Sequence, residues 1–311
     1  MSGTEPNKKI YSKMLVQLGE ENPHIVVADA DVSCSTGTSA FGEKFPGRFY
    51  NFGAAEQNMI SAVAGMASCG LMPFASTFAA FASMRACDQV RQSIAYTNLN
   101  VKIVANNAGL ENNGDGVTHQ AIEDLSIMRG MPNMTVLCPS DNTITAKAVR
   151  AAAAHKGPVY IRLGRYGVPP LHPDDVEFEI GKMIRIAEGG DLTIIATGRM
   201  VEMAMDAVEQ LKAQGISAAL LECHTIKPID KEAIIKAATQ TGRIITCEDH
   251  SVVGGLGSAV CEVLSENTPA RVRRIGVNDL FARSARDYKD LFNKYGLTAE
   301  NIMKNALELL K

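Results

Sequence analysis

The chain has 311 residues, of which 46% are hydrophobic and 21% charged, with a formal net charge of −3. This length favours about two domains, and so small a net charge provides no electrostatic basis for binding nucleic acid or an anionic membrane. The seven cysteines are scattered and include no Cys-x-x-Cys pair, which argues against a zinc site or a disulfide framework and predicts a cytoplasmic protein.

Helical and strand-like stretches alternate through the first half of the chain. Residues 1–9 contain no apolar signal core. The apolar spacing then predicts helices over 8–21, 55–69, 79–96, 122–130 and 141–155, and strands over 25–29, 72–77, 101–105, 134–138 and 158–163. A long polar loop is expected over 106–120. Such alternation is typical of a parallel sheet with helices on both faces.

The pattern loosens from residue 164 to 190, where glycine, proline and acidic residues gather. It then resumes with expected strands over 192–197, 217–221, 243–248 and 271–276, and with helices over 200–214, 230–241, 255–265 and near the C-terminus. We therefore expect an α/β protein of two doubly wound domains with mainly parallel sheets. They would cover 1–170 and 191–311, with a linker over 171–190.

Glu56 is the one charged residue between Arg48 and Arg85. The uncharged stretch 57–84 is long enough to cross a membrane, but glycine, proline and amide residues interrupt it, and small residues outnumber large aliphatic ones. We interpret it as a buried helix followed by a strand. Glu56 is then expected to be buried without a cationic partner and able to give a proton near neutral pH. The common alternative is a carboxylate that only stabilises its helix N-terminus.

Two further features lie at the carboxyl ends of expected strands, where open α/β sheets bind ligands. Phe78 and Phe81 are three residues apart, so on a helix start they share a face that suits either core packing or stacking of a flat ring. The loop 106–120 contains Asp115, which can bind hydroxyl groups, and His119, which can transfer protons.

In combination and order, four segments resemble the transketolase family of thiamine diphosphate enzymes. They are FGAAEQNM at 52–59, STFAAF at 76–81, GDGVTHQ at 114–120 and VLCPSD at 136–141. The resemblance covers essentially the whole chain. It implies a pyrimidine-binding domain followed by a transketolase C-terminal domain.

The resemblance also implies roles for individual residues. Glu56 would hydrogen-bond a ring nitrogen of the cofactor's aminopyrimidine and promote the tautomer that deprotonates the thiazolium carbon. Phe78 and Phe81 would pack on the pyrimidine, and Asp31 would contact the cofactor. The implied substrate-binding residues are Ser35 and Arg165 near the phosphate end, and Asp115 and His119 near the sugar hydroxyls and the reacting carbonyl, with His119 also catalytic.

Two positions depart from the family pattern. Asn107 stands where the family usually has a histidine that helps to bind the substrate phosphate, and asparagine carries no charge. Met84 stands where an aromatic residue is common. Both departures weaken the expectation of an ordinary pentose or hexose phosphate as substrate.

Three glycine or histidine features are assigned no chemistry. Gly114-Asp-Gly116 and Asn142 have about the spacing of the magnesium–diphosphate motif, but no buried strand precedes them and Asn142 begins a helix. We therefore expect no metal ligands in this chain. Gly254-Gly-Leu-Gly257 is not followed by the third glycine of a dinucleotide fingerprint, and His250 is assigned to C-terminal-domain structure.

With that motif rejected, the chain would hold half of an active site. The expected partner is a separate diphosphate-binding N-terminal transketolase subunit that holds Mg²⁺ or Ca²⁺, in an α2β2 heterotetramer. The expected reaction moves a two-carbon glycolaldehyde unit from a ketose to an aldose, in the phosphate forms. The alternatives are a β-like half of a 2-oxoacid dehydrogenase E1 component, a deoxyxylulose-phosphate-synthase-like half, and a non-catalytic regulator that kept the fold.

Overall fold

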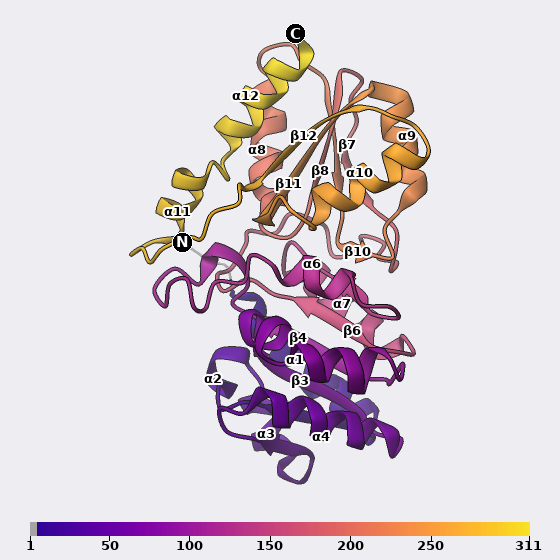
Figure 1. The fold of residues 1–311 in the computed structure, drawn as a ribbon, viewed down its shortest axis with the longest axis vertical. Helices are drawn as coiled ribbons and strands as arrows, with labels where there is room; N and C mark the ends of the chain where they lie inside the picture. The colour runs from indigo at the N-terminus through magenta and orange to yellow at the C-terminus, as the bar shows by residue number, and fades with distance from the viewer. Residues whose placement is uncertain (1–4) are drawn as a thin grey trace.

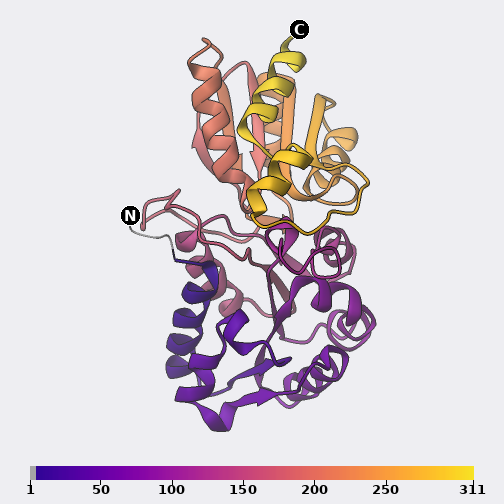
Figure 2. The same ribbon diagram turned by 90° about the vertical axis from the view of Figure 1, so that its left-hand side faces the viewer.

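The computed structural model describes residues 5–311, so the interpretation of residues 1–4 lies outside the described part of the chain. Figures 1 and 2 show two α/β units arranged end to end along the long axis, the first half of the chain in indigo to magenta and the C-terminal half in orange to yellow. Each unit is built on its own sheet. The expected fold class, two mainly parallel α/β units, is therefore confirmed.

The first unit contains a seven-stranded sheet in the order β10-β5-β6-β4-β3-β1-β2, with every pairing parallel except that of β10 with β5. Its strands are β1 (Ile25–Asp29), β2 (Phe49–Asn51), β3 (Met72–Phe78), β4 (Lys102–Asn106), β5 (Thr135–Leu137), β6 (Val159–Arg162) and β10 (Thr225–Lys227). Its helices are α1 (Asn7–Glu21), α2 (Ser33–Thr36), α3 (Ser39–Lys44), α4 (Glu56–Ser68), α5 (Cys87–Gln89), α6 (Asp124–Arg129) and α7 (Asn142–Ala154).

Alternating strand residues bury opposite faces of this sheet, as the pleat requires. Val27 packs in a cluster with α1, α3 and α7, whereas its neighbour Ala28 packs in a cluster with α4, α6 and the segment 81–95. The helices thus cover both faces. The carboxyl ends of β1, β3 and β4 meet at one edge, next to the loops that carry the expected site residues.

The second unit contains a five-stranded sheet in the order β12-β11-β8-β9-β7, parallel except for β7 against β9. Its elements are β7 (Ile184–Ala187), β8 (Leu192–Ala196), α8 (Met200–Lys212), β9 (Ala218–Glu222), α9 (Lys231–Thr241), β11 (Arg243–Ser251), α10 (Leu256–Glu266), β12 (Arg271–Val277), α11 (Tyr288–Tyr295) and α12 (Ala299–Leu310). In Figure 1, α8 and α12 lie on one side of the sheet and α9 and α10 on the other.

Some elements differ from the sequence-based expectation. Strand β7 lies inside the expected linker, and β10 leaves the C-terminal half to join the first sheet, which ties the two units together. The helix expected over 79–96 is interrupted by two π-helical segments, Phe81–Arg85 and Val90–Ala95. The stretch 57–84 contains most of α4, the whole of β3 and the start of the first π-helical segment. Within residues 5–311, no helix is long and apolar enough to cross a membrane.

Candidate active site

Glu56 is the first residue of α4, at the carboxyl-end edge of the first sheet. Its side chain is 3% exposed, and its Oε2 accepts a hydrogen bond of 2.9 Å from Nη1 of Arg85. The expectation that Glu56 lacks a cationic partner is therefore wrong. Arg85 follows the uncharged stretch in sequence, but β3 and the π-helical segment bring it back to α4. The positive end of the α4 dipole also favours a carboxylate here.

An aromatic cluster adjoins this ion pair. The rings of Phe78, at the end of β3, and Phe81 stack with centroids 5.8 Å apart. The His119 ring presents an edge to Phe81 at 5.1 Å and to Phe78 at 6.2 Å. The Arg85 guanidinium lies over the Phe81 ring, 4.1 Å from its centroid. The structure thus places both phenylalanines and His119 in one cluster, and Arg85 connects this cluster with Glu56.

The backbone of the loop after β4 presents the polar residues of the site. Nη1 of Arg165 donates to Asn112 Oδ1 at 2.6 Å and to Asp115 Oδ2 at 3.3 Å, so Arg165 and Asp115 lie together. The hydroxyl of Thr118 and Nδ1 of His119 are hydrogen-bonded at 2.9 Å. Because Nδ1 is occupied, Nε2 is the ring nitrogen that His119 has available for a substrate.

The C-terminal unit holds this loop in place through buried charges. Arg199, which directly precedes α8, forms an ion pair with Glu111, and Glu111 in turn accepts a hydrogen bond from the Tyr166 N–H at 3.0 Å. The Asp249 carboxylate accepts from the Leu110 N–H at 3.1 Å. Burial raises the pKa of Asp249 to about 7, against the opposing influence of nearby Arg162. Residues of both units therefore position the loop 106–120.

Three other expected site residues lie along the same edge but outside the aromatic cluster. Asp31 is exposed at a φ of 65° and exchanges two hydrogen bonds of 3.1 Å with Asn51, while Ser35 is half-buried in α2. Asn107 is 6% exposed and has a φ of 56°, a left-handed conformation that asparagine tolerates. None of the three forms a side-chain hydrogen bond with Glu56 or His119 in residues 5–311.

Asp29, which the sequence interpretation passed over, sits at the end of β1 and is fully buried. It accepts hydrogen bonds from the Val32 N–H at 2.7 Å and from the hydroxyls of Thr36 and Thr38 at 2.7 and 2.8 Å. Burial raises its pKa despite these hydrogen bonds. Asp29 therefore shapes the turn that carries Asp31. The segment Ala28-Asp-Ala-Asp31 contains two acidic residues, and the sequence alone does not show which of them is buried.

The features assigned no chemistry have structural partners. Asp115 of the Gly-Asp-Gly segment pairs with Arg165, and Asn142 directly follows Asp141, whose side chain caps α7. His250 is fully buried; its Nδ1 is hydrogen-bonded to the Ser251 carbonyl, and it accepts at 3.4 Å from Ser126 N–H in the first unit. No cluster of three or more histidine, cysteine or acidic side chains arranged to hold a metal ion occurs in residues 5–311.

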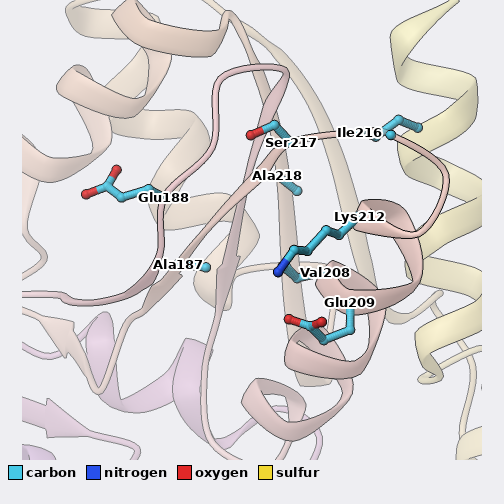
Figure 3. A pocket seen from close by; sticks show the side chains of 9 residues that line it. Ala187, Glu188, Val208, Glu209, Lys212, Ile216, Ser217 and Ala218 are labelled. Carbon is cyan, nitrogen blue, oxygen red and sulfur yellow. The ribbon is translucent and has the colours of Figure 1, made fainter.

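An open cavity of about 480 Å³ lies elsewhere, in the C-terminal unit (Figure 3). It is lined by residues of α8, β9 and the β7 end, among them Glu188, Glu209 and Lys212. It shares no residue with the cluster around Glu56. Its size alone does not connect it with the chemistry of the carboxyl-end edge.

Comparison with known families agrees with this geometry. Residues 6–170 match the transketolase pyrimidine-binding domain, and residues 181–302 match the transketolase C-terminal domain. The chain therefore belongs to the transketolase family, whose members are in general thiamine diphosphate-dependent.

Individual relatives are separate transketolase subunits. The chain is 45% identical over 300 residues to the 6-deoxy-6-sulfo-D-fructose transketolase subunit of Clostridium sp., covering 96% of this chain and 92% of that one. It is 39% identical over 305 residues to one of the subunits of the apulose-4-phosphate transketolase of Phocaeicola vulgatus, covering 98% and 97%. Among solved structures, a split-gene transketolase described as an inactive β4 tetramer matches with 47% identity and a TM-score of 0.91, covering 99% of both chains.

The cluster around Glu56 fits the pyrimidine half of thiamine diphosphate. The guanidinium of Arg85 is a planar, N–H-donating group that lies over Phe81 and bonds Glu56. An aminopyrimidine ring is likewise planar, and its ring nitrogen can hydrogen-bond a carboxyl group. The Arg85 guanidinium shows that a flat group can contact both Phe81 and Glu56 at once.

Proposed function

We propose that this chain is the pyrimidine-binding subunit of a split transketolase. The enzyme transfers a two-carbon glycolaldehyde unit from a ketose to an aldose. In this proposal, residues 1–170 form the pyrimidine-binding domain, 171–190 a linker that includes β7, and 191–311 the transketolase C-terminal domain. The single observation that carries the proposal is the planar cation held between Glu56 and Phe81 beside His119.

On the cofactor side, the bound group would supply an electron sink for breaking the bond next to the donor's carbonyl. Phe78 and Phe81 provide the apolar surface against which its ring stacks. Glu56 would hydrogen-bond the ring nitrogen and give it a proton, which favours the imino tautomer of the ring. Asp31 is assigned a cofactor contact at the neighbouring loop. Burial of Glu56 at 3% exposure keeps water from competing for its carboxylate.

On the substrate side, Asp115 accepts hydrogen bonds from sugar hydroxyls, and Nε2 of His119 faces the reacting oxygen. Arg165 binds the anionic end of the sugar, helped by Ser35 and by the uncharged Asn107. Nε and Nη2 of Arg165 form no hydrogen bond in residues 5–311, so the guanidinium group retains N–H donors that can bind an anion. The two relatives named above act on a sulfonated and a phosphorylated sugar, which supports an anionic sugar as substrate.

The partner in this proposal is a diphosphate-binding transketolase subunit that holds the cofactor diphosphate and Mg²⁺ or Ca²⁺. The assembly is an α2β2 heterotetramer, in which this chain also self-associates. Support comes from the β4 tetramer of the similar split-gene protein and from the uncharged exposed face of α4, where small residues permit close approach. The seven free cysteines support a cytoplasmic location.

Reconstitution tests the proposal. The chain alone should bind thiamine diphosphate poorly and catalyse no transfer, whereas addition of the diphosphate-binding subunit should give both binding and transfer. Full activity of this chain alone would refute the split-subunit assignment. Decarboxylation of a 2-oxoacid by the reconstituted pair, without ketose cleavage, would instead identify an E1-like or deoxyxylulose-phosphate-synthase-like half. Cofactor-free association without turnover would identify a regulatory partner.

A further inference from the structure

We propose that Arg85 occupies the place of the cofactor's pyrimidine ring and must leave for that ring to bind. This inference rests on the proposed function, because it requires the cluster around Glu56 to be the pyrimidine site. Arg85 makes two contacts there: the hydrogen bond to Glu56 Oε2 at 2.9 Å and the stacking over Phe81 at 4.1 Å. The ring would need the same carboxylate and the same aromatic surface.

The two groups cannot share Phe81. The Phe78 ring lies nearly parallel to the Phe81 ring, with centroids 5.8 Å apart, and the centroid of the His119 ring lies 5.1 Å from that of Phe81. The guanidinium lies at 4.1 Å from the Phe81 centroid, which is contact distance for stacking and leaves no layer between them. A pyrimidine stacked on that surface therefore displaces Arg85, and Glu56 then hydrogen-bonds the ring nitrogen in place of the guanidinium.

Arg85 is held weakly enough to be displaced. Its side chain is 48% exposed, and its guanidinium forms a single hydrogen bond, the one to Glu56, in residues 5–311. Arg162 contrasts with it: that side chain is 7% exposed and is bonded to Asp124 and to two carbonyls. Arg85 also ends the π-helical segment Phe81–Arg85, where Ala86 N–H bonds the Phe81 carbonyl at 3.0 Å. Such segments are frequent at functional sites.

Displacement gives Arg85 a role in cofactor affinity. While the ring is absent, Arg85 keeps the buried Glu56 carboxylate paired, which avoids an uncompensated buried charge. When the ring enters, Arg85 moves toward solvent, and breaking its two contacts reduces the net affinity for the cofactor. A residue that only supported the site would act in the opposite direction, because its removal would weaken binding.

The test measures the Kd for thiamine diphosphate in the complex reconstituted with the diphosphate-binding subunit. Arg85→Ala is compared with Arg91→Ala. Arg91 is an exposed arginine on the following π-helical segment, Val90–Ala95, and forms no side-chain hydrogen bond or ion pair in residues 5–311. Arg91→Ala controls for the loss of a positive charge near an anionic cofactor. We expect Arg85→Ala to bind about tenfold more tightly than wild type, which corresponds to about 1.4 kcal/mol, and Arg91→Ala to bind equally or more weakly. Unchanged or weaker binding by Arg85→Ala overturns the proposal.

Guanidinium ion provides a second, independent measurement. In Arg85→Ala it should compete with thiamine diphosphate at concentrations below those that unfold the protein, whereas sodium at equal ionic strength should not. Absence of this selective competition counts against the proposal. If wild type binds the cofactor but these effects are missing, only the role of Arg85 fails. If no variant binds the cofactor, the proposed function fails and the role of Arg85 with it.

Discussion

His172 Nε2 lies 3.0 Å from Glu222 Oε2, so a residue that follows β6 of the first sheet meets β9 of the second. The other ring nitrogen, Nδ1, lies 3.4 Å from Asp141 Oδ2, at the cap of α7. All three side chains are buried. The ring of His224 also lies nearby. Burial lowers the pKa of His224 to about 4, and the charge of His172 is the second cause. A protonated His172 therefore joins two acids from different units.

The stability of the protein should depend on the charge of His172. Burial opposes protonation of His172, but Asp141 and Glu222 outweigh it and raise its pKa to about 9. The folded protein thus binds this proton more tightly than the unfolded chain, so the stabilisation is complete below pH 6.5 and is lost as the pH rises through 9. In urea titrations between pH 6.5 and 9.5, the free energy of unfolding of wild type should fall by about 2–3 kcal/mol more than that of His172→Gln.

The matched control for this titration is His24→Gln, because His24 is exposed. It should reproduce the pH dependence of wild type, including the contribution of every other titrating group. Equal pH dependence of His172→Gln and wild type would show that His172 is not charged in the folded protein.

Arg199→Met should destabilise the protein by about 3 kcal/mol, because it leaves the Glu111 carboxylate buried without its partner. The double variant Arg199→Met/Glu111→Leu should recover much of this loss, since the unpaired charge is removed as well. Urea unfolding of the two single variants and the double variant gives the coupling energy between the side chains. If the double variant loses the sum of the stabilities lost by the two single variants, the two side chains do not form the buried ion pair. The reconstituted Arg199→Met enzyme should also show a raised KM, because Glu111 anchors the substrate loop.

Glu56→Gln in the reconstituted pair should suppress exchange of the thiazolium C2 proton by about a hundredfold or more, because glutamine does not provide the carboxylate that shifts the ring's tautomer. Deuterium exchange followed by NMR measures this rate directly. Glu43→Gln, at an exposed acid of α3, is the control and should exchange like wild type. Unchanged exchange in Glu56→Gln, with the fold intact by circular dichroism, would remove Glu56 from the mechanism.

Asn107→His should lower the KM for phosphorylated donors by about threefold to tenfold, the effect of one added charge-assisted hydrogen bond. The left-handed φ of 56° is one that histidine also adopts, so the backbone should accept the change. Initial rates with a phosphorylated and an uncharged ketose distinguish anion binding from a general effect. Equal KM changes for both donors, or none, would remove Asn107 from the phosphate site.

Continuous apolar runs alternating with helical apolar spacing predicted both units and most of their elements. The reason is that strands of a parallel sheet are buried on both faces, whereas the helices that cover them are amphipathic. It missed β10, a three-residue strand whose place in the first sheet depends on contacts with β5, far away in sequence. It also missed the π-helical segments, since a single wide turn does not change a pattern of mostly small residues. Short elements carry too few residues for a period to be read.

The family resemblance implied that Glu56, Phe78, Phe81 and His119 belong to one site, but it gave no place to Arg85. What could have pointed to Arg85 is its spacing: it lies four residues after Phe81, close enough on a helical turn for a guanidinium to reach that ring. No local signal could have connected Arg199 with Glu111, which are separated by 88 residues. Their meeting depends on how the second unit rests on the first.

The sequence by itself determined that Glu56 is buried at the head of an uncharged helix, beside aromatic residues and a polar loop. Only the tertiary structure decided that Glu56 has a charged partner, because the fold brings Arg85 back to Glu56 and places its guanidinium over the Phe81 ring. The physical reason is that hydrophobic periodicity records which side chains leave water, whereas ion pairs between distant residues depend on the packing of whole elements. The sequence shows where each charged residue stands, but which residue pairs with it depends on how the elements pack.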